Sequence, residues 1–331
     1  MSAAGPGAPR VERAIRVADR TVRFRGEPAL VAKALGPLVA LEERPSPALS
    51  GLDVVVDVGP AAPSTRPPTG TRPEEAVVYE PDPVAPRVRA AGVGVATLRG
   101  DGAVEVGVDP GAPEGDTTAE LVTIPALAER LRRDGAFLLH AAVLAPPGAA
   151  GAAYLVPASR GRGKTTLSLS LRRGGWRLLS DDRGWLSGPP ERATVDPWPE
   201  APRVGDRSLF LLPPHVRPGL RDERTGKAQV PSLTPPRLAA PVAVAGVCLP
   251  RLVDGPGGRV ARVAGAAVLA ALAREAVVAT APETAAAALR FVAALLARVP
   301  AYEVEVGDDP RALEAALATT LQALSAPRKA T

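Results

Sequence analysis

The stretch at 155–166, LVPASRGRGKTT, constrains the fold of this chain more than any other. It matches the phosphate-loop pattern G-x-x-x-x-G-K-[ST] at Ala158, Gly163, Lys164 and Thr165, with alanine in the first position. Such a loop needs a strand before it and a helix after it. AAYLVPA reads as the strand, and KTTLSLSLRRGG reads as a helix that stops at two glycines. The stretch therefore predicts an α/β domain with a nucleotide at this loop.

Lysine at position 164 is the residue of the loop that most strongly indicates phosphate binding. Only four of the 40 basic residues of the chain are lysines, so a compact point charge in this place indicates phosphate. The Thr165 hydroxyl is a candidate Mg²⁺ ligand, and Arg160 and Arg162 are either solvated or help to attract an anion. The competing interpretation is a chance match in a chain with 32 glycines. The predicted nucleotide contacts are Ala158, Ser159, Arg160, Gly161, Arg162, Gly163, Lys164, Thr165 and Thr166.

Two adjacent acids, Asp181 and Asp182, follow the apolar strand WRLLS. The order strand, loop, helix, strand favours a parallel sheet with the loop at its carboxyl edge, where such sheets bind ligands. Because side chains alternate along a strand, we expect one carboxylate to face Mg²⁺ and the other to face an acceptor hydroxyl. The alternative is a turn with two solvated acids.

His140 lies in the buried strand FLLHAAVLA, before the turn PPGAAG. A hairpin turn centred near Gly148 and Ala149 places His140 opposite Pro157, beside the mouth of the loop. A satisfied core histidine is the alternative interpretation, and the sequence does not separate the two. The other histidine, His215, lies between prolines and has no evident role.

The remainder of the chain predicts two domains. The first, at 1–128, is a strand-rich α+β unit with runs such as RTVRFRG, GLDVVVDVG, AVVYEP and AVEVGVDP, and with a flexible Pro-rich loop near 58–75. The second, at 129–326, contains the loop and Ala/Leu-rich helices, and 327–331 is a tail. We also expect helices at about 124–133 and 310–324.

Composition excludes several classes of protein. The net charge is +5, but the basic residues are scattered among acids with no aromatic interleaving, so we expect no nucleic-acid partner. The sequence offers no signal peptide and no apolar run long enough for a membrane, which predicts a cytoplasmic location without a membrane partner. The single cysteine, Cys248, reads as a small core residue in a reducing compartment.

With LLHAAVL, ASRGRGKTT and GGWRLLSDD in that order, the chain resembles the HPr kinase/phosphorylase superfamily, and in particular its HPr-kinase-related branch. The resemblance implies a P-loop kinase domain of the HPr kinase/carboxykinase type, with ATP and Mg²⁺ as cofactors and a serine of a small protein or peptide as acceptor. It is compatible with a homo-oligomer. The family's strand histidine falls on His140, its loop lysine on Lys164 and its metal-binding hydroxyl on Thr165. Its paired acids fall on Asp181 and Asp182, of which the second matches the general base.

One departure from the family follows the acids. The Glu-x-Arg-Gly segment of authentic HPr kinase/phosphorylases is absent, so the resemblance implies neither phosphorolysis nor HPr as substrate. Asp196, Glu200 and Arg203 are candidate replacements. Two other functions stay open: an ATP-binding regulatory or partner-docking module with slow or no hydrolysis, and a small-molecule kinase on the same fold.

Overall fold

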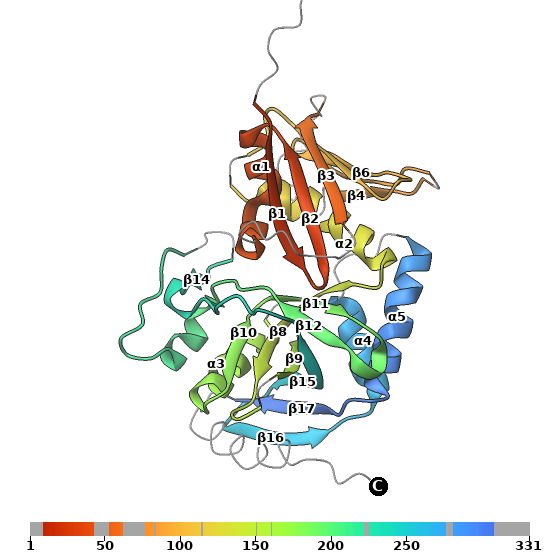
Figure 1. Cartoon of the computed structure of the whole chain (residues 1–331). Coiled ribbons are helices and arrows are strands. Elements are labelled where there is room, and N and C mark those ends of the chain that lie inside the picture. The colour runs from red at the N-terminus through yellow and green to blue at the C-terminus, as the bar shows by residue number, and fades with distance from the viewer. Residues whose placement is uncertain are drawn as a thin grey trace, which may run out of the picture. The chain divides into compact units, whose positions relative to one another are not determined.

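The chain folds into two compact mixed α/β units, one formed by Met1–Asp134 with Val278–Ala285 and the other by Gly135–Val277 with Ala286–Thr331. The sequence predicted a domain boundary between residues 128 and 129. The final helix predicted at 310–324 and the tail lie outside the described residues. The computed structural model (Figure 1) describes residues 9–42, 53–61, 77–82, 84–113, 115–149, 151–159, 161–221, 225–275 and 281–307.

A seven-stranded sheet forms the first unit, in the order β1-β2-β3-β7-β6-β5-β4. The four strand runs predicted here are confirmed as β2, β3, β4 and β7. Residues 58–60 of the predicted flexible loop belong to β3, and most of that loop lies outside the described residues. The strands are β1 (Val11–Val17), β2 (Arg20–Gly26), β3 (Asp53–Pro60), β4 (Val77–Glu80), β5 (Arg87–Ala90), β6 (Gly94–Leu98) and β7 (Val104–Val108).

Short helices pack on this sheet. The pairs β2–β3 and β3–β7 are parallel, and α1 (Pro28–Leu35) with η1 (Gly36–Leu41) forms the connection between β2 and β3. The predicted helix at 124–133 is confirmed as α2 (Ile124–Arg133), which follows the π-helical turn η3 (Ala119–Thr123) and packs against β5, β6 and β7. Parallel pairing requires such a crossover, because a two-residue turn can join only antiparallel strands.

An eight-stranded mixed sheet forms the centre of the second unit. Its path is β10-β8-β11-β12-β15-β17-β16, and β9 pairs with both β8 and β15. Its strands are β8 (Phe137–Ala145), β9 (Ala152–Pro157), β10 (Arg177–Ser180), β11 (Arg183–Ser187), β12 (Thr194–Pro197), β15 (Val242–Leu252), β16 (Gly257–Arg262) and β17 (Ala301–Val306). A separate pair joins β13 (Arg203–Val204) to β14 (Ala228–Gln229). Short 3-10 turns are η4 (Pro190–Arg192), η5 (Asp206–Leu211) and η6 (Pro231–Leu233).

The prediction of a parallel sheet is only partly right. β15 pairs in parallel with β9 and β17, whereas β8 runs antiparallel to both β9 and β10. β9 and β10 are therefore parallel to each other, with β8 inserted between them. The hairpin β8–β9 brings about this insertion, because it returns the chain beside its own start before the crossover through α3 (Lys164–Arg173).

Successive side chains of β8 point alternately into two hydrophobic cores, one on each face of the sheet. Its odd-numbered residues, among them Leu139 and Val143, pack with α4 (Gly265–Glu275) and α5 (Pro282–Leu296). Ala142 and Leu144 pack with Leu167 of α3 on the opposite face. Figure 1 shows α3 on one side of the sheet and α4 and α5 on the other. Because His140 shares the parity of Ala142 and Leu144, its side chain belongs to the α3 face.

Two glycines end α3, as the sequence predicts. Trp176 N donates to the Leu171 carbonyl at 3.0 Å, and Gly175 N donates to the Arg172 carbonyl at 3.1 Å. Together these bonds form a Schellman motif, in which the residue after the cap takes a left-handed conformation. Gly175 has φ +89°, and the Trp176 side chain that follows packs in the core beneath α3.

Replacing Gly175 by alanine is therefore expected to lower the free energy of unfolding by about 1 to 2 kcal/mol, since a Cβ is disfavoured at this φ. Urea unfolding of the whole chain measures the change. Gly205→Ala is the matched control, because Gly205 has φ −85° and open space around its Cα. An equal effect of both substitutions would contradict the capping role.

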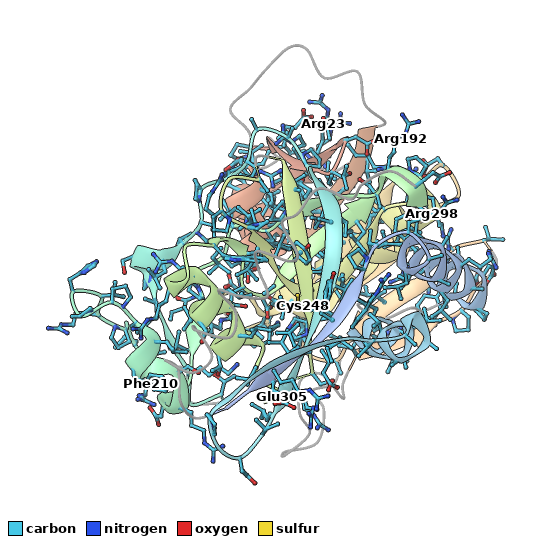
Figure 2. All side chains as sticks on the ribbon, turned by 90° about the horizontal axis from the view of Figure 1, so that it is seen from below. Arg23, Arg192, Phe210, Cys248, Arg298 and Glu305 are labelled. Atoms are coloured by element: carbon cyan, nitrogen blue, oxygen red, sulfur yellow. The ribbon has the colours of Figure 1, made fainter. Side chains whose placement is uncertain are left out.

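Cys248 lies on β15, within the core beside α3. Figure 2 shows it in the interior of the second unit, whereas Phe210 and Glu305 lie at the periphery. Burial raises the pKa of the Cys248 thiol to about 12, so the thiol stays protonated and unreactive. The prediction of a small core cysteine is confirmed. Across the part of the chain that the structure describes, no helix combines the length and apolarity needed to cross a membrane.

Candidate functional site

The glycine-rich stretch forms a loop between the end of β9 and the start of α3. Gly161 and Gly163 have φ values of +80° and +92°, a conformation that glycine adopts without strain. A Cβ at Gly163 would also lie close to Leu252 Cδ2, at 3.0 Å. Ala158 is buried, which accounts for a small residue in the first position of the pattern.

The amino end of α3 follows the loop and carries backbone N–H groups of the first helical turn. The first N–H groups of a helix have no partners within the helix, and its dipole favours negative charge at this end. Ser159, Gly161 and Arg162 are exposed, and Thr165 and Thr166 are partly exposed. The predicted contact Arg160 lies outside the described residues. Thr166 Oγ1 lies 2.7 Å from Ser208 Oγ, so this hydroxyl pair connects α3 to η5.

The acid pair lies at the break between β10 and β11. β10 pairs with residues 143–145 of β8, and β11 pairs with residues 137–140 of the same strand in the same direction. Asp181 and Asp182 lie between the two segments, and the irregularity in register precedes them, between Leu178 and Ser180. Both side chains contact the start of α3, Asp181 through Thr165 and Asp182 through Lys164.

Asp182, Lys164 and His140 meet at one point. Lys164 Nζ lies 3.0 Å from Asp182 Oδ1 and 2.6 Å from His140 Nε2, and His140 Nε2 lies 2.8 Å from the same carboxylate oxygen. The Lys164 side chain is 10% exposed, whereas those of His140 and Asp182 are about one third exposed. A buried ammonium is thus held directly beneath a carboxylate and an imidazole that solvent can reach.

The hairpin register predicted for His140 is wrong by one residue. Ala141 pairs with Pro157, because the turn is centred on Ala149, and His140 instead lies opposite Arg183 of β11. The histidine still lies beside the loop, because its parity on β8 directs it to the face that α3 covers. Its side chain contacts Lys164 and is about one third exposed, so it is not a fully buried core histidine.

Opposing influences set the protonation of Asp182. Burial by itself would raise the pKa of this carboxyl. The hydrogen bond from His140 and the charges of Lys164 and Arg183 together outweigh burial, and they hold the pKa of Asp182 well below its usual range. Asp182 is therefore ionised at neutral pH, with its charge directed toward the mouth of the loop.

Asp181 has the opposite environment. Its side chain is buried, and its Oδ1 has no hydrogen-bond partner among the described residues. Its Oδ2 lies 3.5 Å from Thr165 Oγ1 and accepts a hydrogen bond of 3.4 Å from the Arg203 N–H. Burial raises the pKa of Asp181, and the charge of Asp182 adds to the increase while Lys164 opposes it.

A divalent cation would fit the open oxygen of Asp181. Mg²⁺ binds through one or two carboxylates together with phosphates and water, so it does not need a cage made only of protein. Within the described ranges no three or more His, Cys, Asp and Glu side chains gather as a metal cluster. Asp181 Oδ1 and the nearby Thr165 hydroxyl are the two side-chain oxygens that a nucleotide-borne ion would meet.

Asp181→Asn is expected to raise the free energy of unfolding of the ligand-free protein by about 1 to 3 kcal/mol at neutral pH, since it removes a buried charge whose oxygen lacks a partner. The raised pKa means that the folded state binds this proton more tightly than the unfolded chain. The folded state therefore loses stability as pH rises from about 4, the ordinary aspartate pKa, through the raised value. The gain from the substitution should grow over the same interval.

Denaturant unfolding at several pH values measures this gain. Asp206→Asn is the matched control, because Asp206 is exposed and paired with Arg221 at the surface. A gain that did not change with pH, or the same gain for the control, would argue against a buried charged Asp181.

Sequence reasoning missed the residues that support the acids. Arg183 contacts Asp182, and its guanidinium lies 4.6 Å above the ring of Trp198. Of the candidate replacements, Glu200 contacts Arg183 and the main chain of Arg203 contacts Asp181. Asp196, by contrast, is buried and bound by Arg237 through contacts of 3.0 and 3.2 Å. The place of Arg183 directly after the acids was the signal available in the sequence.

Comparison with known proteins adds no relative. No protein-family model matches the chain, and no curated protein is significantly similar to it. The function is therefore argued from the site itself.

Proposed function

We propose that the protein is an ATP-dependent kinase that transfers the γ-phosphoryl group to a serine hydroxyl of a small protein or peptide. The second unit would be a P-loop kinase domain of the HPr kinase/carboxykinase type, in accord with the resemblance in sequence. The observation that carries the proposal is the contact of 3.0 Å between Lys164, the lysine of the loop, and Asp182, an ionised carboxylate. A phosphate-binding charge and a proton acceptor are thus adjacent.

ATP would bind with its phosphates over the start of α3. The N–H groups of the loop and of the first helical turn would donate to the phosphate oxygens, and the Lys164 ammonium would reach the β and γ oxygens. Lys164 needs only a small movement for this, because its Nζ already lies at the mouth of the loop beside Asp182 and His140. The exposed loop residues leave the phosphates accessible to solvent and to an acceptor.

Asp182 would act on the acceptor. The serine Oγ attacks the γ-phosphorus, its proton passes to an Asp182 oxygen and later to water, and the bond to the bridging oxygen breaks so that ADP leaves with the electron pair. Lys164 would offset the negative charge on the oxygens of the transferring group. His140 would hold Asp182 Oδ1 through the contact of 2.8 Å, and Oδ2, which Arg183 Nε approaches at 3.4 Å, would accept the hydroxyl proton through its other lone pair.

Thr165 and Asp181 would hold Mg²⁺. The Thr165 hydroxyl and Asp181 Oδ1 are the oxygens that fit the ion, and Arg203 N–H keeps the other Asp181 oxygen in place. When bound, the ion neutralises negative charge on the phosphates of the nucleotide. Side chains of this chain would perform the other steps, which are phosphate binding and proton transfer.

The proposal includes a cellular setting. A cytoplasmic protein would have ATP and Mg²⁺ at hand, and neither a membrane nor a nucleic acid is needed for the reaction. A homo-oligomer is compatible with the resemblance. The acceptor would be a serine-containing protein or peptide.

Incubation with γ-labelled ATP, Mg²⁺ and the proteins or peptides encoded by neighbouring genes tests the proposal. Label on a serine of one of them is the expected result. Label on a metabolite would replace the proposal with a small-molecule kinase. Tight ATP binding without transfer would replace it with a regulatory module.

A further inference from the structure

Arg183 connects the acid pair to the segment at 198–203. Its side chain is 8% exposed, and its Nε lies 3.4 Å from Asp182 Oδ2. Its Nη2 lies 3.2 Å from Glu200 Oε1, and its guanidinium lies over the ring of Trp198. One guanidinium therefore bridges two carboxylates while it stacks on a buried indole.

Asp182 is contacted on both oxygens by residues of different elements. His140 of β8 and Lys164 of α3 contact Oδ1, and Arg183 of β11 contacts Oδ2. Arg183 and His140 are direct partners in the β8–β11 register, so the carboxylate between them cannot move without disturbing one of the two contacts.

The same segment supports both acids. Trp198 N donates to the Arg183 carbonyl at 3.0 Å, which fixes the stacked ring beside β11. Further along the segment, Arg203 N–H donates to Asp181. Residues 198–203 thus hold Asp182 through Arg183 and hold Asp181 directly.

We propose that Arg183 is a positioning residue for phosphoryl transfer, anchored by Glu200 and Trp198, and that it aligns the Asp182 carboxylate with the acceptor hydroxyl. This inference rests on the proposed kinase activity. Alignment depends on the shape of the guanidinium as well as its charge, because its planar group lies within ion-pair distance of two carboxylates at once. A lysine in this place would keep the charge but could not bridge Asp182 and Glu200 in the same way.

The test compares Arg183→Gln, Arg183→Lys and Glu200→Gln with the parent chain, in the assay with γ-labelled ATP and a serine acceptor. We expect Arg183→Gln to lower kcat on the order of 100-fold, the usual effect of misplacing a reacting group by about 1 Å. Arg183→Lys should recover less than half of the loss on a logarithmic scale, and Glu200→Gln should lower kcat in the same direction. The Kd for ATP should stay within about twofold in all three, because none of them touches the loop.

A spectroscopic readout accompanies the kinetics. The Arg183 Nε–H, observed by ¹⁵N NMR of the full chain, should exchange slowly in the parent and faster in Glu200→Gln. Arg99→Gln is the matched control, because it breaks an exposed ion pair of the first unit. It should leave kcat unchanged.

Two results would overturn the role of Arg183. If Arg183→Gln had the kcat of the parent, Arg183 would have no role in transfer. If Arg183→Lys restored kcat fully, the role of Arg183 would depend on its charge alone. If the parent transfers no label to any hydroxyl, the proposed function itself fails and the role fails with it. If the Arg183 Nε–H is still protected from exchange in that case, the Arg183 contacts are intact, and the absence of transfer is due to the lack of kinase activity.

Discussion

Asp182→Asn is expected to lower the rate of phosphoryl transfer about 10²- to 10⁴-fold, the range that general acid–base groups contribute, while ATP binds as in the parent. Asparagine keeps the size of the side chain but cannot accept the serine proton. ATP affinity should not fall, because Asp182 competes with phosphate for the Lys164 ammonium at 3.0 Å. Single-turnover transfer of the γ-label and equilibrium binding of ATP measure the two quantities separately.

The matched control is Asp206→Asn, which removes an exposed carboxylate from the same unit. It should transfer phosphate at the parent rate. Equal transfer rates for Asp182→Asn and the parent would contradict the assignment of Asp182 as general base.

Lys164→Ala is expected to weaken both ATP binding and transfer. The ammonium would bind the β and γ phosphates in the ground state and offset charge on the transferring group, and loss of one such stabilising group costs about 10²- to 10³-fold in kcat. Asp181 and Asp182 also lose the cation that lowers the pKa of both carboxyls. The substitution should therefore lower kcat/KM more than any change confined to the acids.

ATP titration and transfer assays on the same preparation check this expectation. Lys33→Ala in the first unit is the control, since Lys33 donates to the Ala112 carbonyl, far along the chain from the loop. A variant at Lys164 that bound ATP as tightly as the parent would show that the phosphates lie elsewhere.

Local patterns predicted the elements around the site. The two glycines at 174–175 predicted the end of α3. The helical spacing of apolar residues in IPALAERLRR predicted where α2 begins and ends. The strands β8 and β9 and the loop between β9 and α3 followed from runs of apolar residues and from glycine spacing. These features depend on neighbours within one or two turns of chain, which is the range that sequence periodicity reports.

The arrangement of the strands could not be predicted in the same way. Insertion of β8 between β9 and β10 and the break at Asp181 and Asp182 depend on pairings between distant segments. The displacement of the hairpin by one residue came from the turn, whose centre the glycines alone do not determine. Arg183 escaped notice because charged residues are common in this chain, and only the fold brings it to 3.2 Å from Glu200.

Analysis of the phosphorylated residue tests the central claim most directly. The parent chain is incubated with γ-labelled ATP, Mg²⁺ and the candidate acceptors, and the label is located by acid hydrolysis and by mass spectrometry. The account predicts phosphoserine on one acceptor, formed by the parent and lost in Asp182→Asn. ATP bound at the loop with no label on any hydroxyl would contradict it.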